Sequence, residues 1–239
     1  MFNGENLTRL EAYLTQHHLP VEAHRLSQFA QYRTLVLEWN TKINLTAITD
    51  LEAFERLHYI DSLAAALHPA FVQADRIVDM GTGGGFPGVP LAILHPEKQF
   101  VLVDSLAKRL KVIDQMVSAI GLTNCETVHG RAEDLGQNPQ YREQFPLCVS
   151  RAVANLPVLA EYCLPLVQVG GTFLAYKGPE GEGELAAGAH AVSLLGGDEG
   201  SVTDAGDCSD GHILIAISKK KHTPKGYPRK AGTPAKQPL

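Results

Sequence analysis

The sequence lacks the spacings with which cysteine and histidine form metal centres or disulfide frameworks. Its four cysteines, Cys125, Cys148, Cys163 and Cys208, contain no Cys-x-x-Cys pair, and two of them lie in apolar segments typical of strands. The ten histidines form no His-Glu-x-x-His motif. We therefore expect free, buried thiols and no metal site.

Long apolar runs and an export signal are missing as well. No segment approaches the roughly 20 apolar residues that a helix needs to cross a bilayer, and residues 1–6 carry an acid where a signal peptide would be basic. These absences predict a cytoplasmic protein without a membrane partner. With 239 residues, 44% of them hydrophobic, the chain is long enough for one substantial core and an appendage, and we expect a monomer.

Glycine is concentrated in one place. Residues 76–88 read Arg-Ile-Val-Asp-Met-Gly-Thr-Gly-Gly-Gly-Phe-Pro-Gly, a short apolar strand followed by a glycine-rich turn. Glycine allows positive φ and a close approach of a ligand to the backbone, and Pro87 presets φ for the first turn of the helix that follows. This pattern predicts a nucleotide-type cofactor at the N-terminus of that helix.

A second strand, residues 100–104, ends in the acid Asp104 about 20 residues past the glycines, the spacing at which a carboxylate binds ribose hydroxyls. Dinucleotide enzymes and S-adenosylmethionine methyltransferases share this spacing. The register Gly83-x-Gly85-x-x-Gly88 also fits the dinucleotide fingerprint. The glycine turn alone therefore leaves both cofactors open.

The wider pattern predicts an α/β fold behind a helical N-terminal segment. Apolar residues recur at helical spacing over residues 7–14 and 26–37 and again after Asp50, where Pro69 should end the helix. Strands and helices then alternate, which indicates a parallel sheet covered on both faces, and two late strands without a helix between them indicate an antiparallel edge. The seven predicted strands are residues 76–80, 99–104, 125–129, 146–151, 171–177, 201–203 and 211–218, with helices at 88–95, 106–120 and 155–165 and a loop entering a short helix at 178–197.

Residues 219–239 differ in charge from the rest of the chain. They hold seven of the 21 Lys and Arg residues and no acid, so the remainder has 14 basic against 26 acidic residues, a formal charge of −12, while the whole chain carries −5. This composition predicts a disordered basic tail that contacts phosphates, with a tail that only aids solubility as the alternative. The predicted organisation is a helical extension, residues 1–70, an α/β domain, residues 71–218, and this tail.

Ordered blocks along the whole chain resemble the bacterial 16S ribosomal RNA guanine-N7 methyltransferases, also called the glucose-inhibited division protein B family. The agreement includes Trp-Asn-Thr-Lys-Ile-Asn-Leu-Thr at 39–46 and Asp-Met-Gly-Thr-Gly-Gly-Gly-Phe-Pro-Gly at 79–88. Further matching blocks are residues 58–62, 104–109, 130–134, 150–152, 176–178 and 228–234. Chance does not produce so many blocks in order.

The resemblance implies a class I, Rossmann-like methyltransferase fold that transfers a methyl group from S-adenosyl-L-methionine to N7 of guanine 527 in 16S ribosomal RNA. The partner would be the free RNA or the small ribosomal subunit. Carried over block by block, the cofactor contacts would come from the ends of the first four strands, at Gly81, Phe86, Asp104, Ala132, Glu133 and Arg151.

The chemistry agrees with the motifs that are missing. Guanine N7 has an exposed lone pair and loses no proton on methylation, so no general base is required and we assign no catalytic residue. The fourth strand ends in residues 149–153, Val-Ser-Arg-Ala-Val, without the Asn-Pro-Pro-aromatic signature of exocyclic amine methylation. No Pro-Cys pair is present for attack on a pyrimidine carbon.

Two cations end strands at the crevice of the glycine turn. We expect Arg151 and Lys177 to bind RNA there, through guanine O6 or a phosphate, since N7 must stay free to react. His58 and Asp61 lie one helical turn apart. We expect them to orient the N-terminal helices on the α/β domain rather than to act in catalysis.

Simpler roles stay open for several of these residues. Asp104 could only cap the helix that follows it, Glu133 could be a solvated loop acid, and Glu133 or Asp134 could form a structural ion pair with Arg151. Lys177 could extend from the sheet edge to solvent. For the whole protein, a dinucleotide-dependent oxidoreductase and a non-enzymatic ribosomal-RNA-binding module are the alternatives, although no Tyr-x-x-x-Lys hydride-transfer site follows the fifth strand.

Overall fold

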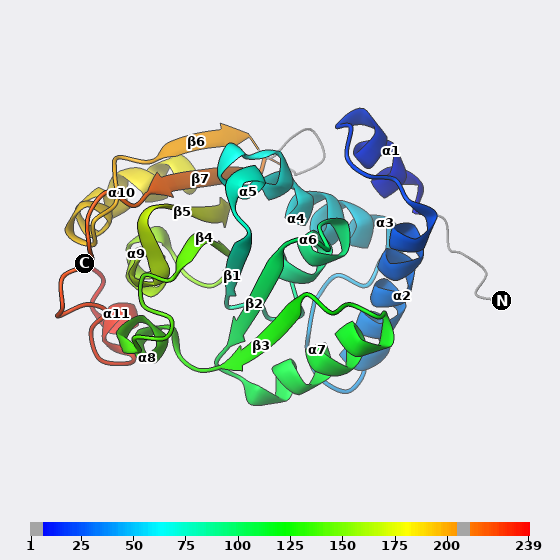
Figure 1. Ribbon diagram of the computed structural model, residues 1–239, viewed down its shortest axis with the longest axis horizontal. Coiled ribbons are helices and arrows are strands. Elements are labelled where there is room, and N and C mark those ends of the chain that lie inside the picture. Colours follow the sequence, from blue (N-terminus) through cyan, green and yellow to red (C-terminus); the bar gives the residue numbers. More distant parts are fainter. Residues whose placement is uncertain (1–6, 205–210) are drawn as a thin grey trace.

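The computed structural model describes residues 7–204 and 211–239, which form an α/β fold around one sheet (Figure 1). The seven strands have the order β3-β2-β1-β4-β5-β7-β6, and β7 lies antiparallel to both of its neighbours. The predicted seven-stranded, mostly parallel sheet is therefore confirmed. The strands are β1 Arg76–Met80, β2 Gln99–Asp104, β3 Cys125–His129, β4 Phe145–Arg151, β5 Val167–Lys177, β6 Ser201–Asp204 and β7 Ile213–Ser218.

Both faces of the sheet are buried, because apolar side chains alternate between the faces along the central strands. On β1, Ile77 packs in one core and Val78 in the other, and Leu102 and Val103 divide in the same way on β2. Such continuous apolar runs locate strands well in a sequence. Only β5 begins clearly earlier than predicted, at Val167.

The first face is covered by the N-terminal helices together with α6 and α7 (Figure 1). The helix predicted after Asp50 is interrupted by a π-helical turn, Glu55–Ile60, and Pro69 begins a new short helix rather than only ending one. The elements are α1 Thr8–Gln16, α2 Ala23–Asn40, α3 Leu51–Phe54, α4 Asp61–Leu63, the 3₁₀ turn Ala64–Leu67, α5 Pro69–Gln73, α6 Gly88–Leu94 and α7 Ala107–Ala119.

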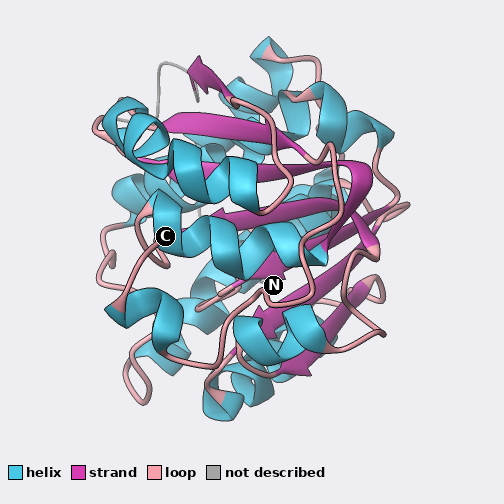
Figure 2. Ribbon diagram, turned by 90° about the vertical axis from the view of Figure 1, so that its left-hand side faces the viewer, coloured by secondary structure: helices cyan, strands magenta, loops and turns pink. Residues whose placement is uncertain are grey.

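The second face carries α8 (Ala132–Gln137), α9 (Leu156–Cys163) and α10 (Gly181–Leu194), so that helices lie in front of and behind the strands in Figure 2. The prediction of a loop and a short helix at 178–197 is wrong, because α10 alone has 14 residues. Its small residues allow close packing on α9: a Cβ added to Gly188 would lie 3.3 Å from a carbon of the Leu156 side chain.

Residues 219–239 are folded, so the prediction of a disordered tail is wrong. They pack against α8 and α9 and contain a short helix, α11 Thr233–Lys236 (Figure 1). Lys219 is fully buried, and Arg229 donates several hydrogen bonds to the fully buried carboxylate of Glu161. The segment is thus held by polar partners on distant elements, which its own composition does not reveal.

Within the described residues, no helix is long and apolar enough to cross a membrane. The same residues contain no group of three or more His, Cys, Asp or Glu side chains that could hold a metal ion. Cys148 and Cys163 are buried free thiols and Cys125 is a half-buried one, while Cys208 lies outside the described residues.

Candidate cofactor and substrate site

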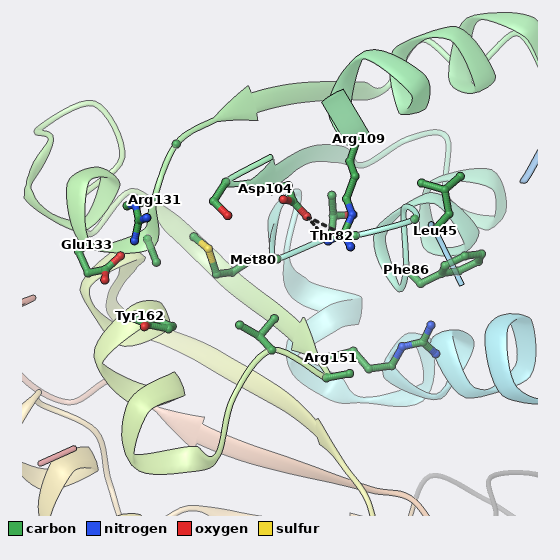
Figure 3. Close-up of a pocket in the computed structure, with 18 of the residues that line it drawn as sticks. Leu45, Met80, Thr82, Phe86, Asp104, Arg109, Arg131, Glu133, Arg151 and Tyr162 are labelled. Carbon is green, nitrogen blue, oxygen red and sulfur yellow. Dashed lines mark hydrogen bonds and ion pairs between the residues drawn. The ribbon is translucent and has the colours of Figure 1, made fainter. Parts of the chain in front are cut away.

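A cavity of about 490 Å³ lies at the carboxyl ends of β1, β2 and β4, where open α/β sheets bind ligands. In Figure 3 the glycine turn and Asp104 form one side of it, Glu133 and Tyr162 lie at one end, and Arg151 extends away from them. All six residues predicted to contact the cofactor line this cavity, namely Gly81, Phe86, Asp104, Ala132, Glu133 and Arg151.

The turn after β1 depends on glycines in the left-handed region. Gly81 has φ of +77° and Gly83 has φ of +58°. A Cβ added to Gly81 would lie 2.3 Å from Cγ2 of Val153, whereas a Cβ on Gly83 would have only a backbone oxygen near it, at 3.9 Å. Gly81 therefore allows the turn to pack on the loop after β4, and Gly83 leaves open space at the cavity.

Asp79 fixes the start of α6 beneath this turn. Its Oδ2 accepts a hydrogen bond from the Thr82 hydroxyl at 2.7 Å and another from the N–H of Gly88 at 2.9 Å. Burial raises the pKa of Asp79 to about 6. A Cβ added to Gly88 would lie 2.7 Å from the same oxygen, so glycine is required for the helix to approach the strand this closely.

Asp104 is held by backbone N–H groups on two loops. Its Oδ1 accepts from the N–H of Leu106, just before α7, at 2.8 Å, and its Oδ2 accepts from the N–H of Gly83 at 3.0 Å. Arg109 forms a longer ion pair with Oδ2, at 3.8 Å. A carboxylate has about four lone-pair sites, so Asp104 can make these contacts and still accept from a ligand in the cavity.

The cavity wall nearest the N-terminal helices is aromatic. The rings of Phe86 and His58 stack with centroids 4.2 Å apart. His58 Nδ1 lies 3.2 Å from Nη2 of Arg151, and Nε2 lies 2.6 Å from the hydroxyl of Thr46. Because a guanidinium only donates, Nδ1 accepts and the ring proton is on Nε2. Burial, aided by the Arg151 charge, lowers the pKa of His58 to about 3, so the ring is neutral.

Arg151 joins β4 to the N-terminal helices. Its guanidinium donates to Oδ2 of Asp61 at 2.6 Å, and Asp61 is fully buried. Burial opposes ionisation of Asp61, but hydrogen bonds and charge from His212 and Arg151 hold its pKa below the ordinary value. The partner of Arg151 is therefore Asp61, and not Glu133 or Asp134.

The opposite end of the cavity is formed by α8 and α9. Glu133, in the first turn of α8, is only 5% exposed, so it is not a solvated loop acid. Its Oε1 accepts a hydrogen bond at 2.8 Å from the N–H of Gly232, in the C-terminal segment. Ala132 and Tyr162 lie beside it. The folded C-terminal segment thus orients an acid of the cavity.

Lys177 lines a neighbouring cavity of about 390 Å³, which shares Arg151 with the first. Its ammonium donates to the carbonyl oxygen of Ala154 at 2.6 Å and pairs with Glu184 at 2.7 Å. Lys177 is 9% exposed, so it does not extend into solvent. Any contact of Lys177 with RNA belongs to this second cavity.

Several residues that line the first cavity lie outside the predicted set, among them Leu45, Arg109 and Tyr162. Leu45 and Arg109 fall within the blocks 39–46 and 104–109, so the resemblance could have singled them out. Tyr162 comes from the interior of α9, where no spacing or motif distinguishes a lining residue from a core residue.

Comparison with known proteins agrees with this geometry. Residues 25–213 match the family model of rRNA small subunit methyltransferase G. A relative named ribosomal RNA small subunit methyltransferase G, from Clostridium novyi (strain NT), is 48% identical over 217 residues, which cover 90% of this chain and 89% of the relative. A relative of the same name from Halalkalibacterium halodurans is 43% identical over 236 residues, covering 98% and 99% of the two chains.

Solved structures share the fold at lower identity. The S-adenosylmethionine-dependent methyltransferase SibL aligns with a TM-score of 0.57 and 13% identity, covering 90% of this chain and 74% of that one. The O-methyltransferase TomG from Streptomyces achromogenes, in complex with S-adenosylmethionine, aligns with a TM-score of 0.52 and 18% identity, covering 92% of this chain and 100% of that one. The fold is that of class I S-adenosylmethionine-dependent methyltransferases, and by its sequence the chain belongs to the rRNA small subunit methyltransferase G family.

Proposed function

We propose that this protein transfers a methyl group from S-adenosyl-L-methionine to N7 of guanine 527 in 16S ribosomal RNA, in the cytoplasm and as a monomer. Membership of the family supports the coarser statement, an S-adenosylmethionine-dependent methyltransferase of small-subunit ribosomal RNA. The observation that supports the site is the cavity in which the six cofactor residues of the sequence pattern come together.

The residues of the cavity fit this cofactor. Gly83 leaves room at the position that a side chain would fill, and Asp104 presents a carboxylate for ribose hydroxyls. Oε2 of Glu133 has no partner among the described residues, so it can accept from a further N–H or O–H group. Phe86 and His58 supply flat aromatic surface. When bound, the cofactor supplies an electrophilic methyl group on a sulfonium sulfur.

The protein's own task is then to position the acceptor and to exclude water. Guanine N7 attacks with a lone pair and loses no proton, so the residues need not act as a general base. His58 is neutral and engaged at both ring nitrogens. We assign it to shaping the wall of the site, not to moving protons.

Mass mapping tests the proposed function. Free 16S ribosomal RNA and assembled small subunits are incubated with the protein and isotopically labelled S-adenosylmethionine, then digested and sequenced by mass. We expect one labelled methyl group, at N7 of guanine 527. Label at another nucleotide, or transfer to neither form, would contradict the proposal, and the form that is labelled identifies the partner as free RNA or the subunit.

A pair of glycine variants tests the cofactor site. Gly81→Ala places a Cβ against Val153 and should weaken binding of S-adenosylmethionine at least tenfold by calorimetry. Gly121→Ala is the matched control, because Gly121 has a similar φ of +72° with nothing within 4 Å of an added Cβ. Both variants incur the backbone cost of a left-handed residue, of about 1–2 kcal/mol. Equal cofactor affinity in the two would reject this placement.

The two alternative functions have less support. A dinucleotide-dependent oxidoreductase and a non-enzymatic module both disagree with membership of a methyltransferase family. Gly88, the last glycine of the dinucleotide register, is required for packing α6 on Asp79. Packing therefore explains the glycine at this position without a bound dinucleotide. Melting curves with S-adenosylmethionine and with NAD separate the cofactors, since only a bound ligand raises the melting temperature.

A further inference from the structure

The second cavity, of about 390 Å³, lies beside the cofactor cavity at the carboxyl ends of β4 and β5. Arg151, Ala152 and Val153 line both cavities, so the loop after β4 is their common wall. Ala152 has φ of +57°, which residues with a Cβ rarely adopt, and Val153 is 39% exposed. A group held in the second cavity is therefore next to the place where the cofactor binds.

The second cavity contains an ion pair between the buried Lys177 and the half-buried Glu184. Oε2 of Glu184, on α10, lies 2.7 Å from the Lys177 ammonium and also accepts from the N–H of Leu156 at 2.7 Å. Oε1 of Glu184 has no partner among the described residues. Lys177 uses two of its three donors, on Glu184 and on the carbonyl of Ala154. One carboxylate oxygen and one ammonium hydrogen of the pair are left for a ligand.

The contacts with Leu156 and Ala154 give the pair a structural role, but they do not account for its unused hydrogen-bonding capacity. A charged pair that lines a cavity and retains unused hydrogen-bonding capacity is better explained by recognition of a ligand.

The pair complements one nucleobase. On its Watson–Crick edge guanine presents the acceptor O6 next to two donors, N1–H and the 2-amino group, which match the Lys177 ammonium and the Glu184 carboxylate respectively. Adenine presents an amino group and an unprotonated N1 on that edge, so it would direct a donor at the lysine and a lone pair at the carboxylate. Adenine also has a free N7. N7 alone therefore cannot select guanine, whereas the Watson–Crick edge distinguishes the two bases and leaves N7 free to react.

We propose that Glu184 and Lys177 form the guanine-recognition subsite, with Lys177 donating to O6 and Glu184 accepting from N1–H and the 2-amino group. Held by this edge, the base turns its five-membered ring, which carries N7, toward the wall shared with the cofactor cavity. The inference rests on the proposed function and specifies how its substrate is chosen. It also gives a role to α10, whose sequence carries no recognisable motif.

The test compares guanine with inosine, which lacks only the 2-amino group, at the methylated position of small-subunit RNA. The wild-type protein should methylate inosine with at least a tenfold lower kcat/KM, because Glu184 loses a donor. Glu184→Gln should lower kcat/KM for guanine and bring the guanine-to-inosine ratio to within about twofold of one. Glu182→Gln is the matched control, since it removes the same charge from an exposed position on the same helix.

The outcomes distinguish recognition of guanine by Glu184 from a purely structural role of this residue. If Glu184 only supports the loop and Lys177, Glu184→Gln lowers both rates equally and leaves the ratio at its wild-type value, which overturns the inference. A wild-type ratio near one overturns it as well, even if the variant fails to fold. Failure of the wild-type protein to label any guanine in natural RNA would instead overturn the proposed function, and with it the inference.

Discussion

The segments that precede and follow the α/β domain are each attached to it by an ion pair. The N-terminal segment supplies the acid of its pair, and the C-terminal segment supplies the base. The N-terminal helices supply the fully buried acid Asp61, which pairs with Arg151 of β4 at 2.6 Å. The C-terminal segment supplies Arg229, which pairs at 2.6 Å with the fully buried Glu161 of α9. In Figure 1 the two segments lie on opposite sides of the molecule.

The two segments differ in what they contribute to the first cavity, at the carboxyl ends of β1, β2 and β4. Leu45 and His58 of the N-terminal segment line it directly, whereas residues 219–239 contribute no lining residue and act through the hydrogen bond from Gly232 to Glu133. The N-terminal segment therefore forms part of the cavity wall, and the C-terminal segment contacts a residue of that wall. Breaking the first contact should affect turnover, while breaking the second should affect cofactor affinity.

Asp61→Ala should have the largest effect. It leaves the Arg151 guanidinium without its carboxylate, and loss of one partner of a buried ion pair costs about 3–5 kcal/mol of unfolding free energy. Turnover should fall too, because Arg151 and His58 lose their orientation. Urea unfolding and methyl-transfer rates measure both effects. Glu182→Ala, which removes an exposed acid from α10, should change stability by less than about 0.5 kcal/mol; similar losses in the two variants would contradict the assignment.

Arg229→Met should cost less, about 2–3 kcal/mol, because the Glu161 carboxylate keeps the backbone N–H of residue 229 at 2.7 Å. Cofactor affinity should weaken about tenfold through Glu133, with kcat at saturating cofactor nearly unchanged. The double variant Arg229→Met/Glu161→Gln should recover part of the stability, since it leaves no unpaired buried charge and keeps an acceptor for the N–H of residue 229. A fall in kcat as large as the loss of affinity would show that the C-terminal segment belongs to the reacting part of the site.

A pH series with His58→Gln tests the N-terminal contact further. The pKa of His58 is about 3 in the folded protein against an ordinary 6.5, so below pH 6.5 the unfolded chain binds a proton that the folded chain does not. The free energy of unfolding therefore falls as pH decreases below 6.5, by up to about 1.4 kcal/mol per pH unit, and is unaffected by protonation of this residue above that pH. Unfolding free energies measured from pH 7 to pH 5 should slope less steeply in His58→Gln than in the wild type.

The control for that series is His190→Gln, which alters an exposed histidine on α10. It should retain the wild-type slope. An unchanged slope in His58→Gln would mean that His58 is protonated in the folded protein and that the tautomer assigned from Arg151 is incorrect.

The sheet and the glycine turn could be predicted because their signals are local. Strands buried on both faces give continuous apolar runs, and the turn after β1 needs glycine at positions such as Gly81, where φ is positive. Apart from Asp104 and the glycines, the predicted residues that line the cavity could be singled out only from the blocks that carry the resemblance. Spacing alone could not tell an S-adenosylmethionine site from a dinucleotide site.

The C-terminal segment and α10 could not be predicted because their partners are distant in sequence. Arg229 is ordered by Glu161 and Gly232 by Glu133, contacts that join residues 68 and 99 positions apart. A basic composition with few apolar residues resembles that of a disordered tail until the acids that receive it are known. Likewise, glycine and alanine in α10 suggest a loop, although their small size is what lets the helix pack on α9.

Lys230→Gln should have the smallest effect, and it asks whether the folded C-terminal segment also binds RNA. Lys230 is exposed, so its loss should leave stability within about 0.5 kcal/mol of the wild type. If it contacts a phosphate, the dependence of log affinity on log salt should become shallower by about 0.7–0.9, measured with small subunits or 16S ribosomal RNA. Lys111→Gln, an exposed lysine on α7, is the matched control. Equal slopes for both variants would assign Lys230 no phosphate contact and leave the segment a structural role alone.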